Sequence, residues 1–201
     1  YWSMGNYDKA LELMESVHNY FIKIDDKSWM DLHVNMGMLY FAKGLYQESY
    51  ENFTISIKIR QQKGQLSQIF YPSMGLGKVY VQRQEFRKAL YYLQEAYDLC
   101  KKLDLRGWGE LLGVSTLLVL TKQELGLSYN DIDFKGLLNN PTRGLFALDY
   151  NYRLYHILED TSYLETAYNQ VQEKTANLEP DVKAKFLSYP IPKAIVEEWE
   201  K

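Results

Sequence analysis

A pattern of aromatic, glycine and small residues recurs along the first half of the chain at an almost constant spacing. Six positions align in three copies, which read Tyr1, Gly5, Tyr7, Ala10, Met14, Val17, then Tyr40, Gly44, Tyr46, Ser49, Phe53, Ser56, then Tyr80, Gln84, Phe86, Ala89, Leu93, Ala96. The second copy follows the first by 39 residues at every position, and the third follows the second by 40. Periods of about 20 to 50 residues are typical of solenoids, in which each repeat is one supersecondary unit.

Each copy has the residues of two antiparallel helices joined by a tight turn. Gly44 stands at the turn, where glycine adopts a left-handed backbone without a Cβ clash. Apolar residues follow at spacings of three and four, as in Ala89, Leu93 and Ala96, and this period predicts helices. Gly37 and Gly77 add a seventh matching position, where a small residue lets two helices cross closely. Helices are expected near 6–22, 28–43, 46–62, 67–82, 86–103 and 107–125, and no strand pattern competes.

One such hairpin cannot bury its apolar face alone, so the copies are expected to stack into an all-α solenoid with a concave side. Residues 1–126 are assigned to the repeats, the first of them truncated. Residues 127–201 are assigned to a degenerate helical repeat followed by a C-terminal capping segment. Within it we expect helices near 145–158 and 163–178, another starting at Pro180, an interruption at Pro190 and Pro192, and a last helix over 194–199.

The motifs of residues 1–103 resemble the tetratricopeptide repeat. The matching stretches are Met36-Gly37-Met38-Leu39-Tyr40, Gly44-Leu45-Tyr46, Ser49, Leu76-Gly77, Tyr80, Phe86 and Ala89. A period near 40 is similar to the longer-helix subclass found in kinesin light chains, polarity adaptors and bacterial signalling regulators. The resemblance implies a right-handed superhelix of antiparallel helix pairs. HEAT repeats have a similar period and are the alternative, but they lack this Gly/Tyr/Ala pattern.

The C-terminal tail carries a second, shorter resemblance. The stretch from Asn177 through Pro180 and Phe186 to Trp199 looks like the end of tetratricopeptide arrays in large bacterial signalling proteins. Those proteins carry ATPase, kinase or nucleotide-cyclase domains elsewhere in the polypeptide. The resemblance implies a regulatory or sensor region that controls such a domain. The chain starts at Tyr1 without a methionine, so we expect it to be a piece of a longer protein.

Composition excludes several classes of function. The formal net charge is only -3, which does not indicate nucleic acid or an anionic membrane as a partner. Cys100 is the single cysteine, so no disulfide can form within the chain and a reducing cytoplasm is expected. No apolar stretch reaches the roughly 18 residues of a membrane-spanning helix, and we expect no signal peptide.

No residue pattern indicates catalysis, and we expect no enzyme, no cofactor and no metal site. Gly75-Leu76-Gly77-Lys78 fails the phosphate-loop pattern, because Pro72 replaces the first glycine and Val79 follows the lysine. The three histidines, His18, His33 and His156, lack a second ligand at metal spacing.

The predicted binding surface is the concave groove, which the first helix of each tetratricopeptide hairpin lines. The face opposite the packing residues offers Asp31, Val34, Asn35, Met38, Ala42, Tyr71, Met74, Lys78 and Gln82. Asn35 resembles the asparagine with which related arrays hold a peptide backbone, but Gly75 takes its place in the third copy. Met38 and Met74 offer an adaptable apolar floor, or they simply pack against a neighbouring helix.

The predicted function is a non-catalytic scaffold that binds a peptide or protein segment in this groove. The alternative is the regulatory region described above, with a neighbouring domain of the same polypeptide as partner. A homodimer through the truncated first repeat is a further expectation, because that repeat exposes its apolar face.

Overall fold

The turn residue of each copy has the same left-handed backbone in the computed structural model, which describes residues 5–23, 30–104, 110–132, 138 and 147–201. Gly5, Gly44 and Gln84 have φ of 81°, 81° and 59°. The amide of the next residue then bonds back to the aromatic position: Leu45 N donates to Tyr40 O, and Glu85 N donates to Tyr80 O, both at 2.9 Å. This is the hydrogen-bond pattern of a glycine-type helix end.

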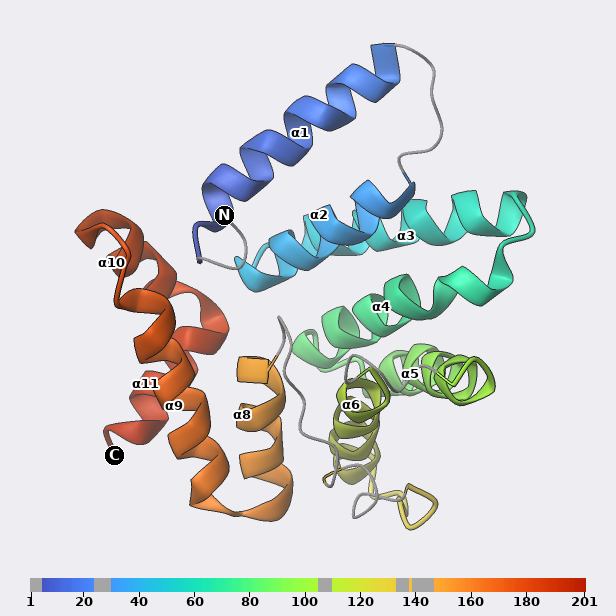
Figure 1. Ribbon diagram of the computed structural model, residues 1–201. Helices are drawn as coiled ribbons and strands as arrows, with labels where there is room; N and C mark the ends of the chain where they lie inside the picture. The colour runs from blue at the N-terminus through green and yellow to red at the C-terminus, as the bar shows by residue number, and fades with distance from the viewer. Residues whose placement is uncertain (1–4, 24–29, 105–109, 133–137, 139–146) are drawn as a thin grey trace.

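The chain forms paired helices throughout, and the described residues contain no strand (Figure 1). The elements are α1 (Tyr7–Lys23), α2 (Met30–Ala42), α3 (Tyr46–Gln62), η1 (Leu66–Ile69), α4 (Phe70–Gln82), α5 (Phe86–Lys102), α6 (Glu110–Glu124), α8 (Ala147–Leu158), α9 (Thr161–Thr175), α10 (Pro180–Ser188) and α11 (Pro190–Trp199). The first six α-helices lie within a few residues of their expected ranges. The all-helical, tetratricopeptide-like array is thereby confirmed.

Small residues bring the two helices of each pair into close contact. A Cβ on Gly77 would lie 2.5 Å from Leu93 Cγ, so α4 and α5 could not approach each other as they do with any larger residue. In the preceding pair, a Cβ on Gly37 would lie 2.8 Å from the Phe53 ring. Ser49 in α3 is fully buried, and its hydroxyl donates to the Gly37 carbonyl at 2.8 Å. Gly77 therefore serves helix packing, as expected.

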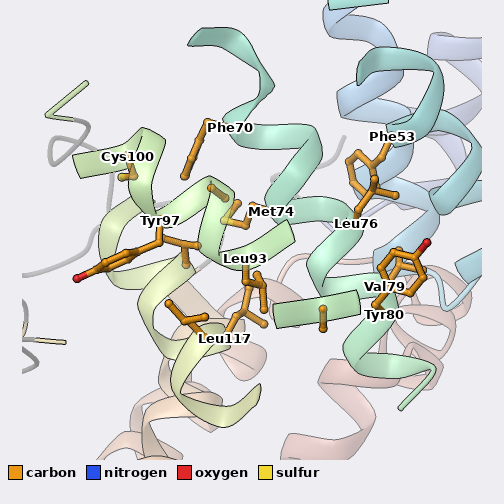
Figure 2. Packing of buried hydrophobic residues seen from close by; sticks show 14 of the residues in the cluster. Phe53, Phe70, Met74, Leu76, Val79, Tyr80, Leu93, Tyr97, Cys100 and Leu117 are labelled. Atoms are coloured by element: carbon orange, nitrogen blue, oxygen red, sulfur yellow. The ribbon is translucent and has the colours of Figure 1, made fainter. Parts of the chain in front are cut away.

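The same contacts join successive copies. Lys43 Nζ pairs with Asp8 Oδ1 at 2.6 Å, and the residues one period later, Arg83 and Gln47, form a side-chain hydrogen bond of 2.6 Å. The buried side chains of α2 to α6 form one continuous apolar core, shown in part in Figure 2. The second and third copies thus share this core, as expected of a solenoid, whereas Ala10 and Leu11 of α1 form a separate small cluster with Met36 and Leu39 of α2.

The C-terminal helices α8 to α11 form a second core of their own. It is built around Leu164, Ala167, Val171, Phe186 and Ile195. The helix that starts at Pro180 ends at Ser188, and Tyr189 is extended, so the chain is interrupted next to Pro190 as expected. The last helix, however, begins at Pro190 and not at the expected 194, since proline is tolerated in the first turn of a helix. Residues 133–137 and 139–146 of the degenerate repeat expected after residue 127 lie outside the described residues.

The two ends of the array meet. Tyr7 of α1 stacks on Tyr189, with ring centroids 5.0 Å apart, and its edge contacts Phe186 at 5.8 Å. Asp8 also pairs with Lys185 Nζ at 2.6 Å. We call these five residues the terminal contact. In Figure 1 the C-terminal helices accordingly curve back towards the start of α1. No described helix is long and apolar enough to cross a bilayer.

Candidate protein-binding cleft

The first helices of the second and third copies place four predicted groove residues around one cavity. Met38 and Ala42 come from α2, and Met74 and Lys78 come from α4. The cavity has a volume of about 80 Å³, and Phe41 and Phe53 contribute to the same side. A single water needs about 10–15 Å³ of such space, so the cavity admits several waters or a small apolar side chain.

The opposite wall of the cavity comes from the C-terminal helices. Leu148 and Asp149 lie in α8, Lys174 in α9, and Ile191 and Pro192 at the start of α11. The cleft is therefore bounded on one side by the repeats and on the other by the capping helices. Its lining is mainly apolar, with charge confined to a few side chains.

An ion cluster of Lys78, Asp149 and Arg153 joins the two walls. Lys78 Nζ lies 2.6 Å from Asp149 Oδ2, and Arg153 pairs with Oδ1 of the same carboxylate. Arg153 Nε also donates to Thr116 Oγ1 in α6 at 2.9 Å. Burial would raise the pKa of Asp149, but Arg153 and Lys78 outweigh it and hold that pKa far below its usual range. The carboxylate is therefore ionised at neutral pH.

Burial lowers the pKa of both lysines at the cleft. For Lys78 burial dominates, Arg153 lowers the pKa further, and Asp149 opposes the shift. For Lys174 burial is the cause. Lys78 also lies over the Phe41 ring, 5.5 Å from its centroid. Lys78 is held by Asp149, and most residues that line the cavity are apolar, so apolar contact is the main property that the cavity offers a ligand.

Four other predicted groove residues, Val34, Asn35, Tyr71 and Gln82, do not line the cavity. Val34 is buried in the repeat core, and Asn35 is half-buried. Tyr71 donates to Glu110 Oε1 at 2.7 Å, and Gln82 accepts from Tyr46 at 3.3 Å. The side chain of Asp31 lies outside the described residues. The groove assignment as a whole stays a prediction.

Gly75 explains why the asparagine position is not repeated. A Cβ there would lie 2.5 Å from Phe53 Cε1 of the preceding pair, so no side chain fits. Phe53 fills the space between Gly37 of its own pair and Gly75 of the next. The third copy therefore has no room for an asparagine side chain at this position, because the Phe53 ring fills the space.

Sequence reasoning missed the C-terminal wall of the cleft. Asp149 stands 71 residues from its partner Lys78, and no local pattern links them. The C-terminal helices are expected from the sequence only to cap the array, and no pattern in them indicates contact with α2 and α4. Groups of three or more histidine, cysteine or acidic residues that could hold a metal ion do not occur among the described residues.

The architecture is that of a helical-repeat protein, in which paired helices share a core and leave a cleft on the inner side. Residues 29–102 match the family model of the tetratricopeptide repeat. The match supports a tetratricopeptide repeat protein, a class that generally mediates protein–protein interaction and is typically non-catalytic. No curated protein and no solved structure matches the chain.

Proposed function

We propose that this chain is a non-catalytic scaffold that binds a protein segment in the cleft, inserting one apolar side chain into its cavity. The observation that supports this is the convergence of Met38, Ala42, Met74 and Lys78 on one cavity. Methionine side chains adapt to ligands of different shape, which suits recognition of a flexible segment. A cytoplasmic location is part of the same proposal.

A filled cavity tests this proposal. Ala42→Phe places a ring into the cavity, while Ala184→Phe adds the same ring to an exposed site on α10. Peptides selected on the wild-type chain from a displayed random library are the probe. We expect them to share one apolar residue and to bind Ala42→Phe about tenfold more weakly or worse, since a buried aliphatic side chain contributes about 1.5–3 kcal/mol. Equal binding of the peptides to both variants would contradict binding in the cleft.

The second candidate is a regulatory region that controls an ATPase, kinase or nucleotide-cyclase domain on the same longer polypeptide. The terminal contact favours it, because a helical array whose two ends are joined by only a few side chains can exist in an open and a closed state. Asp8 is shared there between Lys43 and Lys185. A two-state element of this kind is what coupling to a distant site requires.

The coding sequence upstream of Tyr1 tests this second candidate function. A catalytic domain there supports regulation, and we then expect Asp8→Lys to change the activity of that domain in the full polypeptide. Glu12→Lys makes the same charge change one turn later and is the control. A repeat protein without such a domain argues against the candidate.

A further inference from the structure

Tyr7 belongs both to the terminal contact and to the cavity of the cleft. Its ring stacks on Tyr189 with centroids 5.0 Å apart, and the same side chain lines the cavity. Burial raises the pKa of its hydroxyl to about 12, with further contributions from Tyr189 and Asp149, so the hydroxyl is protonated at neutral pH. One neutral side chain therefore touches both the contact that closes the array and the space that a ligand fills.

The residues that follow Tyr189 line the same cavity from the C-terminal side. Helix α11 starts directly after Tyr189, and Ile191 and Pro192 of its first turn form part of the cavity wall. Pro190 packs on the turn of the second copy, because a Cβ on Gly44 would lie 2.9 Å from Pro190 Cγ. This part of the wall is thus in place only while the start of α11 stays beside α1 and the α2–α3 turn.

The C-terminal helices are attached to the repeats at two places of different strength. At one place α8 packs on α6, and the buried ion pair of Lys78 with Asp149 ties α8 to α4. At the other place the start of α11 and the end of α10 meet α1, and the ion pair there is exposed, with the Lys185 side chain 59% accessible to solvent. Exposed ion pairs contribute little, whereas breaking a buried one is costly. The terminal contact is therefore the attachment that opens, while α8 stays in place.

We propose that the terminal contact and the cleft are coupled: the closed array is the state that binds, and a segment bound in the cavity holds the array closed. The inference rests on the proposed binding in the cleft. When the terminal contact opens, Tyr7 separates from Ile191 and Pro192, so a ligand in the cavity loses contacts on one side. A ligand that contacts both ends of the array binds the closed state better, and its binding shifts the population towards closure.

The fraction of closed molecules sets the size of the effect. When only the closed state binds, the apparent dissociation constant is the intrinsic one divided by this fraction, so a variant that is closed about one-tenth of the time binds about tenfold more weakly. Conversely, a ligand at about 100 times its intrinsic dissociation constant raises the ratio of closed to open molecules about 100-fold. Closure is thus measurable both as a cause and as a result of binding.

Two variants of opposite charge test the coupling from outside the cavity, since neither Asp8 nor Lys185 lines it. Asp8→Lys and Lys185→Glu each replace the ion pair by two like charges. The probe is a fluorescent synthetic copy of the peptides selected on the wild-type chain, and fluorescence anisotropy gives its dissociation constant. We expect both variants to weaken binding about fivefold or more. A direct effect of charge on the peptide would have opposite signs in the two variants.

Each variant has a control with the same charge change on the same or the neighbouring helix. Glu12→Lys changes an exposed residue of α1, and Lys193→Glu changes a residue of α11 that is as exposed as Lys185. Both controls should bind the peptide as the wild-type chain does.

The reciprocal measurement uses closure itself as the readout. Spin labels at the exposed positions Ser16 and Ala184, in a Cys100→Ala background, report the distances between α1 and α10. We expect broad distances in Asp8→Lys without peptide and a return to the narrow wild-type distribution at saturating peptide. Broad distances that persist with peptide bound overturn the coupling. Wild-type distances in both Asp8→Lys and Lys185→Glu without peptide overturn it too, because an array that is always closed has no open state for a ligand to shift.

The outcomes separate this inference from the proposed function. Peptides that bind Ala42→Phe and Ala184→Phe equally contradict binding in the cleft, and the coupling fails with it. Peptides that Ala42→Phe weakens, but that bind the opening variants and their controls equally, overturn the coupling alone and leave the cleft as the binding site.

Discussion

At the scale of single residues, glycine sets the distance between paired helices. Gly77→Ala puts a methyl group into Leu93, and overpacking of this kind costs about 1–3 kcal/mol, partly offset by the better helix propensity of alanine, worth about 1 kcal/mol. We expect a net loss of stability in urea denaturation. In the double variant with Leu93→Ala the clash disappears, so the combined loss should be smaller than the sum of the single losses. An additive pair would contradict the contact.

The ion cluster gives a second prediction at this scale. Asp149 neutralises two buried cations, whereas Lys78 can be lost with Arg153 still in place. Removing one partner of a buried pair costs about 3–5 kcal/mol. We expect Asp149→Asn to lower the free energy of unfolding by this order and Lys78→Met to lower it less, both measured at pH 7 in urea. A larger loss from Lys78→Met would show that Asp149 does not hold both cations.

At the scale of elements, the repeat period carried most of the information. The bounds of α3 and α5 follow from their aromatic starts and small buried residues, which recur at every copy. The helices without a copy are harder to bound: the break expected near Pro190 falls at Tyr189, but the prolines stand in the first turn of α11, which starts four residues before the expected 194. A proline pattern predicts a break, but it does not say whether the next helix starts before or after the proline, because proline is tolerated in a first turn.

The α1–α2 contact should respond to pH. His33 is buried, its Nδ1 donates to Asn52 Oδ1 at 2.7 Å, and its ring contacts His18 at 5.0 Å. Burial, opposed by the Asn52 bond and reinforced by His18, lowers the pKa of His33 below its ordinary 6.5. Well above pH 6.5 the imidazole is neutral in both the folded and the unfolded state. As the pH falls below 6.5 the unfolded chain binds the proton first, so folding is progressively destabilised.

We therefore expect the midpoint of thermal unfolding to fall between pH 7 and pH 5. His33→Asn keeps a donor at the position of Nδ1 and removes the titrating group, so its midpoint should fall less over this range. His156, whose pKa burial also lowers, accounts for part of the remaining dependence. An unchanged pH dependence in His33→Asn would rule out His33 as a source.

At the scale of the whole molecule, the sequence predicted an open array with a concave groove, but the closure of that array had no local signature. Tyr7 and Tyr189 meet from opposite ends of the chain, and Asp149 enters the groove from a helix outside the repeats. Periodicity describes how neighbouring units stack and is silent on contacts between distant ones. Four of the nine predicted groove residues thus line the cavity, whereas its C-terminal wall was not predicted from the sequence.

The terminal contact is the weakest part of this closure, because α1 meets the C-terminal helices through a few side chains at its first turn. Asp8→Lys places a third cation between Lys43 and Lys185, so like charges replace two ion pairs. We expect the ring to open while each helical unit keeps its own core. Spin labels at the exposed positions Ser16 and Ala184, in a Cys100→Ala background, should then show longer and broader distances.

Glu12→Lys makes the same charge change away from Lys185 and should keep the wild-type distances, since Glu12 pairs only with the nearby Lys9 among the described residues. Circular dichroism should show equal helix content in both variants, which separates opening from unfolding. Wild-type distances in Asp8→Lys would mean that the aromatic contacts of Tyr7 with Phe186 and Tyr189 suffice to close the ring. The regulatory candidate would then lose its structural basis. An array that stays closed after Asp8 is replaced by a cation has no open state to populate.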